Sequence, residues 1–369
     1  MRYIGNKTRL LPFIVGRLQR LGLPPGSAHD AFAGTAAVAA ALKSRGWRVA
    51  SSDLMTYSYV FQRAYVVANR VPSFTRLREA DPDFRHAARS PAFRAAVSVR
   101  GEGVLAEVAE YLSAWLEPEV GFFSRSFGPD GGRLYFTAEN AGRIDAVRRR
   151  LHEWRTRELI GEDAFYILLA ALIEAADRVA NTAGVYAAFI KSWQPNATKK
   201  LVLAPVAPRR GARGSTAHRA DAVSVARELG EVDLLYVDPP YNSRQYAGYY
   251  HVPEVIARGW FGDHPVLTGK TGLLSDPSLR SDWCSPSRVE GALRRLLAAT
   301  GARHVLVSYN SEGLLGDREL RGILADASSD GPPRRFARAY RRYRADSDHE
   351  RRRYRGDSVR ELLYYVRLR

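Results

Sequence analysis

The sequence predicts an α/β fold in which a mostly helical segment is inserted between two parts of one sheet. Three observations carry this prediction: a strand–turn–helix–strand order near the N-terminus, a second stretch of buried-strand patterns that starts near Asp221, and a highly charged, helix-patterned region between them. We place the sheet-forming parts at 1–69 and 209–369 and the insertion at 70–208. A chain of 369 residues, of which 46% are hydrophobic, is long enough for such a domain.

The first sheet-forming part has the pattern of a helix followed by a β-α-β unit. Prolines and glycines punctuate it, and a crossover of this kind joins parallel strands with a right-handed turn. We expect, in order, a helix over 8–21, a strand over 27–32, a turn at Gly34, a helix over 35–43 and a strand over 48–52 that ends at Asp53.

The remaining elements follow from apolar runs and helical periodicity. In the insertion, apolar residues recur on one face over 164–179, which is typical of an amphipathic helix. We also expect a short strand over 133–137, a Pro/Gly/Arg-rich connector over 205–215, buried strands over 232–237 and 304–309, and a returning strand over 358–368.

Charge and cysteine content narrow the class of protein. The formal net charge of +17 favours a polyanionic partner such as nucleic acid, although most of the excess is arginine and can reflect codon bias. Cys284 is the only cysteine, so an intrachain disulfide and a Cys-rich zinc site are excluded, and we expect no metal. Charged residues interrupt every apolar run near the N-terminus, so we expect a soluble, cytoplasmic protein without a membrane partner.

Two features at the carboxyl edge of the first strands are typical of a nucleotide-like ligand. The turn from Asp30 to Ala36 contains Gly34, which allows the backbone to approach a cofactor. Asp53 ends the next strand, where a carboxylate can hold both hydroxyls of a ribose, or can cap the following helix instead. These features alone fit a dehydrogenase as well as a methyltransferase.

The tetrad Asp238-Pro239-Pro240-Tyr241 separates these two classes. It directly follows the strand over 232–237 and therefore lies at the same edge of the sheet. The exocyclic amine of adenine is a poor nucleophile, and a carboxylate from Asp238 and the carbonyl of Pro239 could accept its two N–H bonds. The prolines stiffen the backbone, and Tyr241 offers a face on which an extruded base can stack. A tight turn without catalytic function is the alternative.

Together these motifs resemble one family. The segment Tyr3-Ile4-Gly5-Asn6-Lys7, the turn Phe32-Ala33-Gly34-Thr35 and the tetrad occur in the order found in Dam-like N6-adenine DNA methyltransferases. The longer context Asp238 to Tyr246 is most similar to the restriction-modification branch of DPPY type. The resemblance extends through Asn181 to Tyr186 and Ser308 to Asn310, so it covers most of the chain.

The resemblance implies a Rossmann-like fold that binds S-adenosyl-L-methionine, and it assigns roles to residues of this sequence. The catalytic residues would be Asp238, Pro239, Pro240 and Tyr241, and the cofactor residues would be Tyr3, Gly5, Lys7, Asp30, Phe32, Gly34, Thr35, Asp53 and Asp221. Asp221 could equally cap a surface helix. Two departures from the family pattern could weaken cofactor binding: Ala36 stands where many relatives have a second glycine, and Asn6 replaces a small hydroxyl residue.

The function implied is site-specific methylation of adenine N6 in double-stranded DNA, by base flipping, within a restriction-modification or related defence system. The insertion over 70–208 would then be the target-recognition region, and a cognate restriction endonuclease would be a partner. Two alternatives stay open: a methyltransferase acting on RNA or on N4 of cytosine, and a non-catalytic DNA-binding module with the same fold.

The C-terminal part carries a further DNA-binding signal. Ten arginines lie between Arg334 and Arg355, interleaved with aromatic residues. Arginines with aromatics can hold phosphates and unstacked bases, so we expect Arg351, Arg352 and Arg353 to contact the DNA backbone. The alternative is a solvated hairpin loop with a charged surface.

Overall fold

The computed structural model describes residues 1–101, 103–341 and 358–368 and forms two compact units. We call Tyr3–Gln62, Arg210–Ala247 and Asp276–Arg369 the sheet unit. We call Met1–Arg2, Arg63–Arg209 and Gly248–Ser275 the helical unit. The segment Gly248–Ser275 belongs to the helical unit, although its sequence does not set it apart from the sheet-forming part.

The sheet unit is built on seven strands in the order β3-β2-β1-β4-β7-β9-β8. β1, β2, β3, β4 and β7 run parallel, and β9 pairs antiparallel with both β7 and β8. This confirms the predicted α/β fold of Rossmann-like type. The strands are β1 (Ser27–Asp30), β2 (Arg48–Asp53), β3 (Thr216–Arg219), β4 (Glu231–Val237), β7 (Gly301–Asn310), β8 (Arg334–Arg341) and β9 (Ser358–Arg367).

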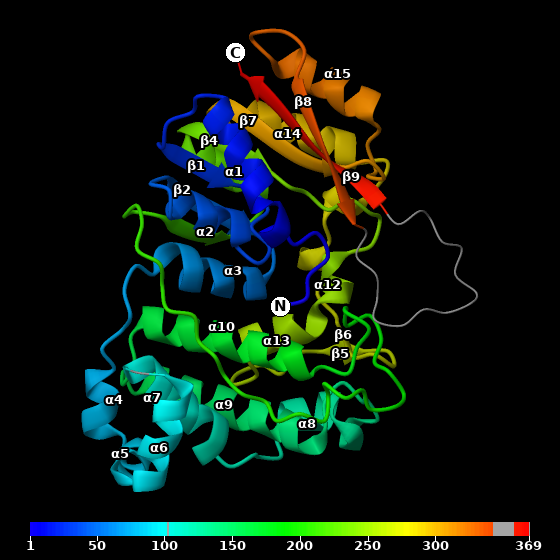
Figure 1. The fold of residues 1–369 in the computed structure, drawn as a ribbon. Helices are drawn as coiled ribbons and strands as arrows, with labels where there is room; N and C mark the ends of the chain where they lie inside the picture. The colour runs from blue at the N-terminus through cyan, green and yellow to red at the C-terminus, as the bar shows by residue number, and fades with distance from the viewer. Residues whose placement is uncertain (102, 342–357, 369) are drawn as a thin grey trace. The chain divides into compact units, whose positions relative to one another are not determined.

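Helices cover both faces of this sheet (Figure 1). On one face, α11, α14 and α15 bury an apolar cluster against alternate residues of β4, β7 and β9, such as Leu235, Val305 and Tyr364. On the other, α1 packs against α2, and Arg17 of α1 lies over the ring of Phe336 in β8. The helices are η1 (Thr8–Leu10), α1 (Leu11–Arg20), α2 (Ala37–Lys43), α3 (Thr56–Gln62), α11 (Ala222–Leu229), η5 (Pro277–Leu279), η6 (Asp282–Cys284), α14 (Val289–Ala299) and α15 (Asp317–Ala327).

The helical unit begins its short helices with residues suited to that position. Asp81 and Ser90 cap α5 and α6 by accepting the amides of Phe84 and Phe93, and a proline follows each cap. The elements are η2 (Arg63–Val67), α4 (Thr75–Ala80), α5 (Pro82–Arg89), α6 (Pro91–Arg100), α7 (Val104–Glu110), η3 (Tyr111–Trp115), α8 (Phe122–Phe127), η4 (Pro129–Gly131), α9 (Ala138–Thr156), α10 (Glu162–Val179), α13 (His251–Arg258), β5 (Leu267–Thr268) and β6 (Leu273–Leu274). One more short helix, α12 (Tyr246–Tyr249), spans the boundary between the units.

Charged side chains of α9 cap the ends of three other elements of the helical unit. Asp145 accepts the Phe123 and Ser124 amides at the start of α8, at 2.9 and 2.7 Å. Arg143 donates to carbonyls at the end of η3, and Arg148 donates to the Ile256 carbonyl of α13 at 2.9 Å. Helix ends have unsatisfied backbone groups, so these contacts explain why a highly charged helix is buried.

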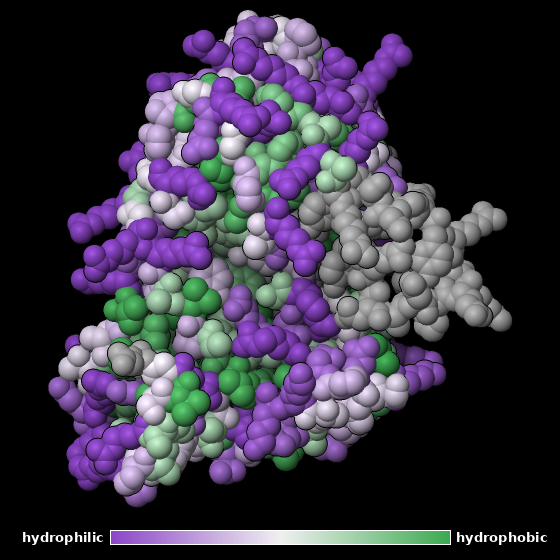
Figure 2. Space-filling model, viewed as in Figure 1, coloured by the Kyte–Doolittle hydropathy of each residue, from purple (hydrophilic) through white to green (hydrophobic). Residues whose placement is uncertain are grey.

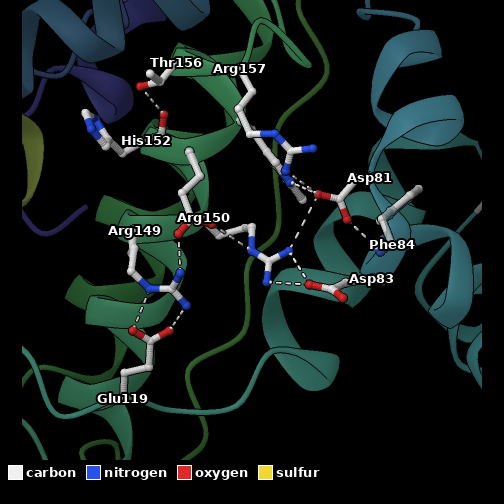
Figure 3. Close-up of polar contacts among 11 residues, drawn as sticks. Asp81, Asp83, Phe84, Glu119, Arg149, Arg150, His152, Thr156 and Arg157 are labelled. Atoms are coloured by element: carbon white, nitrogen blue, oxygen red, sulfur yellow. Dashed lines mark hydrogen bonds and ion pairs between the residues drawn. The ribbon is translucent and has the colours of Figure 1, made fainter.

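A second set of arginines on α9 and at its end ties the surrounding segments together (Figure 3). Arg149 forms a two-bonded pair with Glu119, while Arg150 lies between Asp83, at 3.0 Å, and Asp81, at 3.6 Å. Arg157 points to the same Asp81 carboxylate.

Strongly hydrophilic side chains are spread over the visible face of both units rather than gathered over one element (Figure 2).

One predicted element is wrong. Residues 133–137 form turns that lead into α9, not a strand. Their backbone groups bond to separate partners: the Phe136 amide donates to the Phe127 carbonyl, and the Tyr135 carbonyl accepts the Asn181 amide. The adjacent residues Tyr135 and Phe136 are both buried, so the segment lacks the alternation of a half-buried strand, and the described residues supply no neighbouring strand to form a ladder. No helix among the residues that the structure describes is long and apolar enough to cross a membrane.

Candidate functional site

A cavity opens in the sheet unit where β1, β2 and β4 end. Its free space, counted together with its open mouth, is about 950 Å³. β1 lies between β2 and β4, and α/β folds bind ligands where the strand order reverses in this way. The residues that the sequence singled out for cofactor and catalysis all line it: Tyr3, Gly5, Lys7, Asp30, Phe32, Gly34, Thr35, Asp53, Asp221, Asp238, Pro239, Pro240 and Tyr241.

The glycine turn after β1 is fixed by Asp53 and by the ring of Tyr3. Asp53 accepts the Gly34 amide through Oδ2 and the Met55 amide through Oδ1, both at 2.9 Å. Gly34 has a φ of +51°, and a Cβ there would lie 3.0 Å from the Tyr3 ring. Only glycine fits this turn without a shift. Asp53 therefore braces the cavity wall and also bonds the segment that leads into α3.

Asp30 lies at the end of β1 with only one carboxylate oxygen satisfied. Oδ2 accepts the Ala39 amide of α2 at 3.1 Å, whereas Oδ1 is buried and has no hydrogen-bond partner among the described residues. Burial, followed by the nearby charge of Asp238, raises the pKa of Asp30 to about 8. A buried, unsatisfied carboxylate oxygen at a cavity wall is suited to a cationic donor.

The departure at Ala36 has a structural consequence. Ala36 adopts a left-handed conformation, with φ 58° and ψ 20°, and is fully buried. Residues with a Cβ rarely adopt this conformation, because the side chain crowds the following carbonyl. The strained residue delays the helix, so that α2 begins at Ala37 and not at the expected residue 35.

Lys7 and the tetrad form one hydrogen-bonded group. The Lys7 ammonium lies 3.1 Å from Asp238 Oδ1 and also bonds the Tyr241 hydroxyl, which itself donates to Asp238 Oδ1. No contact of Oδ2 with another described residue is found. Burial raises the pKa of Asp238 to about 6, and the Lys7 charge acts in the opposite direction. One oxygen of Asp238 is therefore held, and the carboxylate can ionise near neutral pH.

The Tyr241 side chain is turned toward the interior of the sheet unit. Its ring packs edge-on against Tyr309 of β7, with centroids 5.4 Å apart, and its hydroxyl is engaged with Asp238 and Lys7. Its expected role as a stacking face for an extruded base stays a prediction. Tyr241 lines the cavity, and the Lys7 ammonium lies over its ring, 4.6 Å from the ring centre.

Several residues of the site were missed in the sequence. Trp283 packs edge-on against Phe32, with centroids 4.7 Å apart, and closes one wall of the cavity. Gln245 exchanges two hydrogen bonds with the backbone of Ser281, at 2.8 and 3.1 Å, which fixes that wall. Glu361 of β9 lies 3.4 Å from Lys7. Gln245 lies within the segment Asp238 to Tyr246 that carries the resemblance, and Glu361 is an acid directly before the apolar run Leu362 to Val366.

Two further expectations concern residues at the margins of the site. Asp221 caps α11 by accepting the Val223 and Ser224 amides, at 2.9 and 3.4 Å, and it also lines the cavity. The structure thus shows Asp221 as a helix cap, and its contact with a cofactor stays a prediction.

The segment that contains Arg351, Arg352 and Arg353 lies outside the described residues.

The chain is similar to known proteins along nearly its whole length. The sequence model of the D12 class N6 adenine-specific DNA methyltransferases matches residues 3–311. The type II methyltransferase M.NlaIII of Neisseria lactamica is 32% identical over 377 residues, which cover 99% of both chains. The type II methyltransferase M.FokI of Planomicrobium okeanokoites is 32% identical over 374 residues, and the modification methylase StsI of Streptococcus sanguinis is 30% identical over 370 residues.

These relatives differ in length. The matches to M.FokI and StsI cover 99% of this chain but 52% of each relative. The chain therefore spans about half the length of these two relatives.

Proposed function

Because the chain belongs to the D12 class of N6-adenine-specific DNA methyltransferases, we propose that it transfers a methyl group from S-adenosyl-L-methionine to N6 of adenine in double-stranded DNA. The observation that carries this proposal is the state of Asp238. One of its oxygens is fixed by Lys7 and Tyr241, and the other has no partner among the described residues and belongs to a residue that lines the cavity.

The charge of the cavity supports a cationic cofactor. The carboxyl groups of Asp30, Asp53, Asp221 and Asp238 line it, whereas the ammonium of Lys7 is already shared among acceptors. With a pKa of about 8, the Asp30 carboxyl group is mostly protonated at neutral pH, and a cation bound beside it would favour its ionised form. S-Adenosyl-L-methionine carries an ammonium group that can supply the missing donor to Asp30 Oδ1, and when bound it supplies an electrophilic methyl group on a sulfonium. The residues present therefore fit this cofactor.

Asp238 and Pro239 are arranged to present an amine. The free oxygen of Asp238 and the Pro239 carbonyl would accept the two N–H bonds of adenine N6, which turns the lone pair of the nitrogen toward the methyl group. The bound cofactor would supply the methyl group, Asp238 would keep the nitrogen in place, and the proton that the methylated nitrogen loses would pass to water. Holding the two reactants in line supplies most of the acceleration, because the sulfonium is already a good leaving group.

The helical unit is proposed to read the target, in line with the expectation for 70–208. The cavity lies within the sheet unit, so the extruded base would enter there while a separate surface holds the duplex. Arg351, Arg352 and Arg353 would add contacts to the DNA backbone. The names of the relatives support a place in a restriction-modification system with a cognate restriction endonuclease.

The test is a direct assay of the product. Purified protein is incubated with duplex DNA and methyl-labelled cofactor, and the DNA is digested to nucleosides. Label in N6-methyladenine is expected, and mapping the modified positions would give the recognition site. Label in N4-methylcytosine, or label only in RNA, would overturn the substrate while keeping the chemistry. Binding of DNA and cofactor without any label would favour the non-catalytic alternative.

A further inference from the structure

Glu361 is a buried carboxylate in a strand whose hydrogen bonding and packing do not require a charged side chain. It lies in β9 and is 7% exposed, next to the apolar residues Leu362 and Leu363. Its Oε1 accepts the Asn310 side-chain amide at 3.0 Å, and these two residues are direct partners in the β7–β9 ladder. Burying a carboxylate costs free energy unless it is paired and hydrogen-bonded, so its position calls for an explanation.

The explanation lies in Lys7, whose three donors meet three acceptors. The ammonium is 3.1 Å from Asp238 Oδ1 and 3.4 Å from Glu361 Oε2, and it also bonds the Tyr241 hydroxyl. Lys7 is 4% exposed, so these groups replace the water that an ammonium normally binds. Lys7 precedes η1 on a short turn, and its ammonium is held between carboxylates of β9 and of the tetrad after β4.

We propose that Glu361 is a positioning residue for the methyl transfer. It holds the Lys7 ammonium from the side of β9, so that Lys7 occupies Oδ1 of Asp238 and leaves Oδ2 to accept the adenine amine. This role rests on the proposed function of the tetrad and adds a residue to it. Asn310 fixes the Glu361 carboxylate in turn.

The charges around Asp238 predict how this role would appear in the pH dependence of methyl transfer. The groups that act on Asp238 are Lys7 and Tyr241, which lower its pKa, and Glu361, which raises it. Asp30 and Tyr236 border the same cluster. Asp238 accepts the amine only when it is ionised, so activity falls as the pH drops through the pKa of about 6. Removing Glu361 or Lys7 should therefore move this acid limb in opposite directions.

The experiment measures methyl transfer to duplex DNA against pH for wild type, E361Q, K7M and the double variant. E361Q should lower kcat about 10-fold to 100-fold, because Lys7 stays near Asp238 but is no longer held on Oδ1. It should also shift the acid limb of kcat/KM to lower pH and leave cofactor affinity nearly unchanged. K7M should shift the limb to higher pH. If Glu361 acts through Lys7, the double variant should be no slower than K7M.

Controls separate positioning from stability. E231Q removes a carboxylate that is 88% exposed in the same sheet and should behave as wild type. E361D should recover part of kcat, and N310L should give a smaller loss in the same sense, which covers the case that E361Q does not fold. An E361Q profile equal to that of E231Q, or losses that add in the double variant, would overturn the inference. Cofactor binding by wild type without any transfer would count against the proposed function instead.

Discussion

The two units use charged side chains in opposite ways. In the sheet unit, carboxylates gather around one cavity, and the ammonium of Lys7 is shared between Asp238 and Glu361. In the helical unit, buried charges of both signs bond the ends of helices: Asp81 and Asp145 accept amides at helix starts, and Arg143 and Arg148 donate to carbonyls at helix ends. Arg148 is 4% exposed and has no carboxylate partner among the described residues, because its guanidinium bonds the last carbonyls of α13.

This difference changes the interpretation of the net charge. A value of +17 suggests a surface for a polyanion. Yet Arg143 and Arg148 cap helix ends, and Arg149 and Arg150 hold carboxylates, so none of these four is free to meet a phosphate. The net charge therefore overstates the cations available for DNA. Substituting charged residues of the cavity in the sheet unit should mainly change the rate of methyl transfer. Substituting the buried arginines of the helical unit should mainly change the free energy of unfolding.

The largest effect should come from Asp238 in the sheet unit. Asp238→Ala should lower kcat for methyl transfer by about 1,000-fold or more, because an acceptor aimed at the reacting nitrogen is lost. Cofactor affinity, measured by calorimetry, should change little. If the variant transfers the methyl group in a single turnover at more than a tenth of the wild-type rate, Asp238 is not a catalytic residue.

Replacing a buried arginine of the helical unit should lower the stability of the protein rather than the rate of methyl transfer. Arg148→Met should lower the free energy of unfolding by about 2–3 kcal/mol, because carbonyls at the end of α13 lose their donors. The matched control is Arg155→Met on the same helix, which is exposed and should change stability by less than about 0.5 kcal/mol. Equal stability of the two variants in urea would break the comparison.

Loss of the proposed DNA contacts should change the salt dependence of DNA binding. Charge reversal at Arg351, Arg352 and Arg353 should flatten the plot of log affinity for DNA against log salt, by about 0.9 for each phosphate that is no longer neutralised. Thermal stability should stay as in wild type. An unchanged slope would show that these arginines do not contact the backbone, and the solvated-loop alternative would then hold.

The smallest effect concerns strain instead of charge. Ala36→Gly should stabilise the protein by about 0.5 kcal/mol, because relief of the left-handed conformation exceeds the loss of one buried methyl group. Ala39→Gly in the same helix is the control and should destabilise by about 1 kcal/mol. Differential scanning calorimetry of both variants gives the comparison, and a loss of stability in Ala36→Gly would mean that packing dominates at this position.

The sequence predicted the sheet unit well because its signals are local. The Gly34 turn and the Gly46 break delimit the first two strands, an apolar run marks the strand before Asp238, and parallel strands bring their carboxyl ends to one edge. The start of α2 was missed by two residues, because the strain at Ala36 is a property of the folded turn. Roles of the individual cavity residues stay predictions that the experiments above test.

The helical unit was harder to predict because its determinants are not local. The arginines of α9 look like a solvated face, and only the positions of η3 and α13 show that they cap other helices. The failed strand over 133–137 has the same cause, since a strand needs a neighbour that the sequence does not announce. Glu361 escaped notice because its partner Lys7 is 354 residues away.

The pairing of Lys7 with Glu361 also has a consequence for synthesis of the protein. A ribosome adds Glu361 only after Lys7 and the 353 residues between them, so β9 is the last of the seven strands to be synthesised. Until β9 emerges, the Lys7 ammonium lacks its contact with Glu361. Chains that stop before β9 would thus contain the tetrad without this contact, and they should modify DNA more slowly than chains that include it.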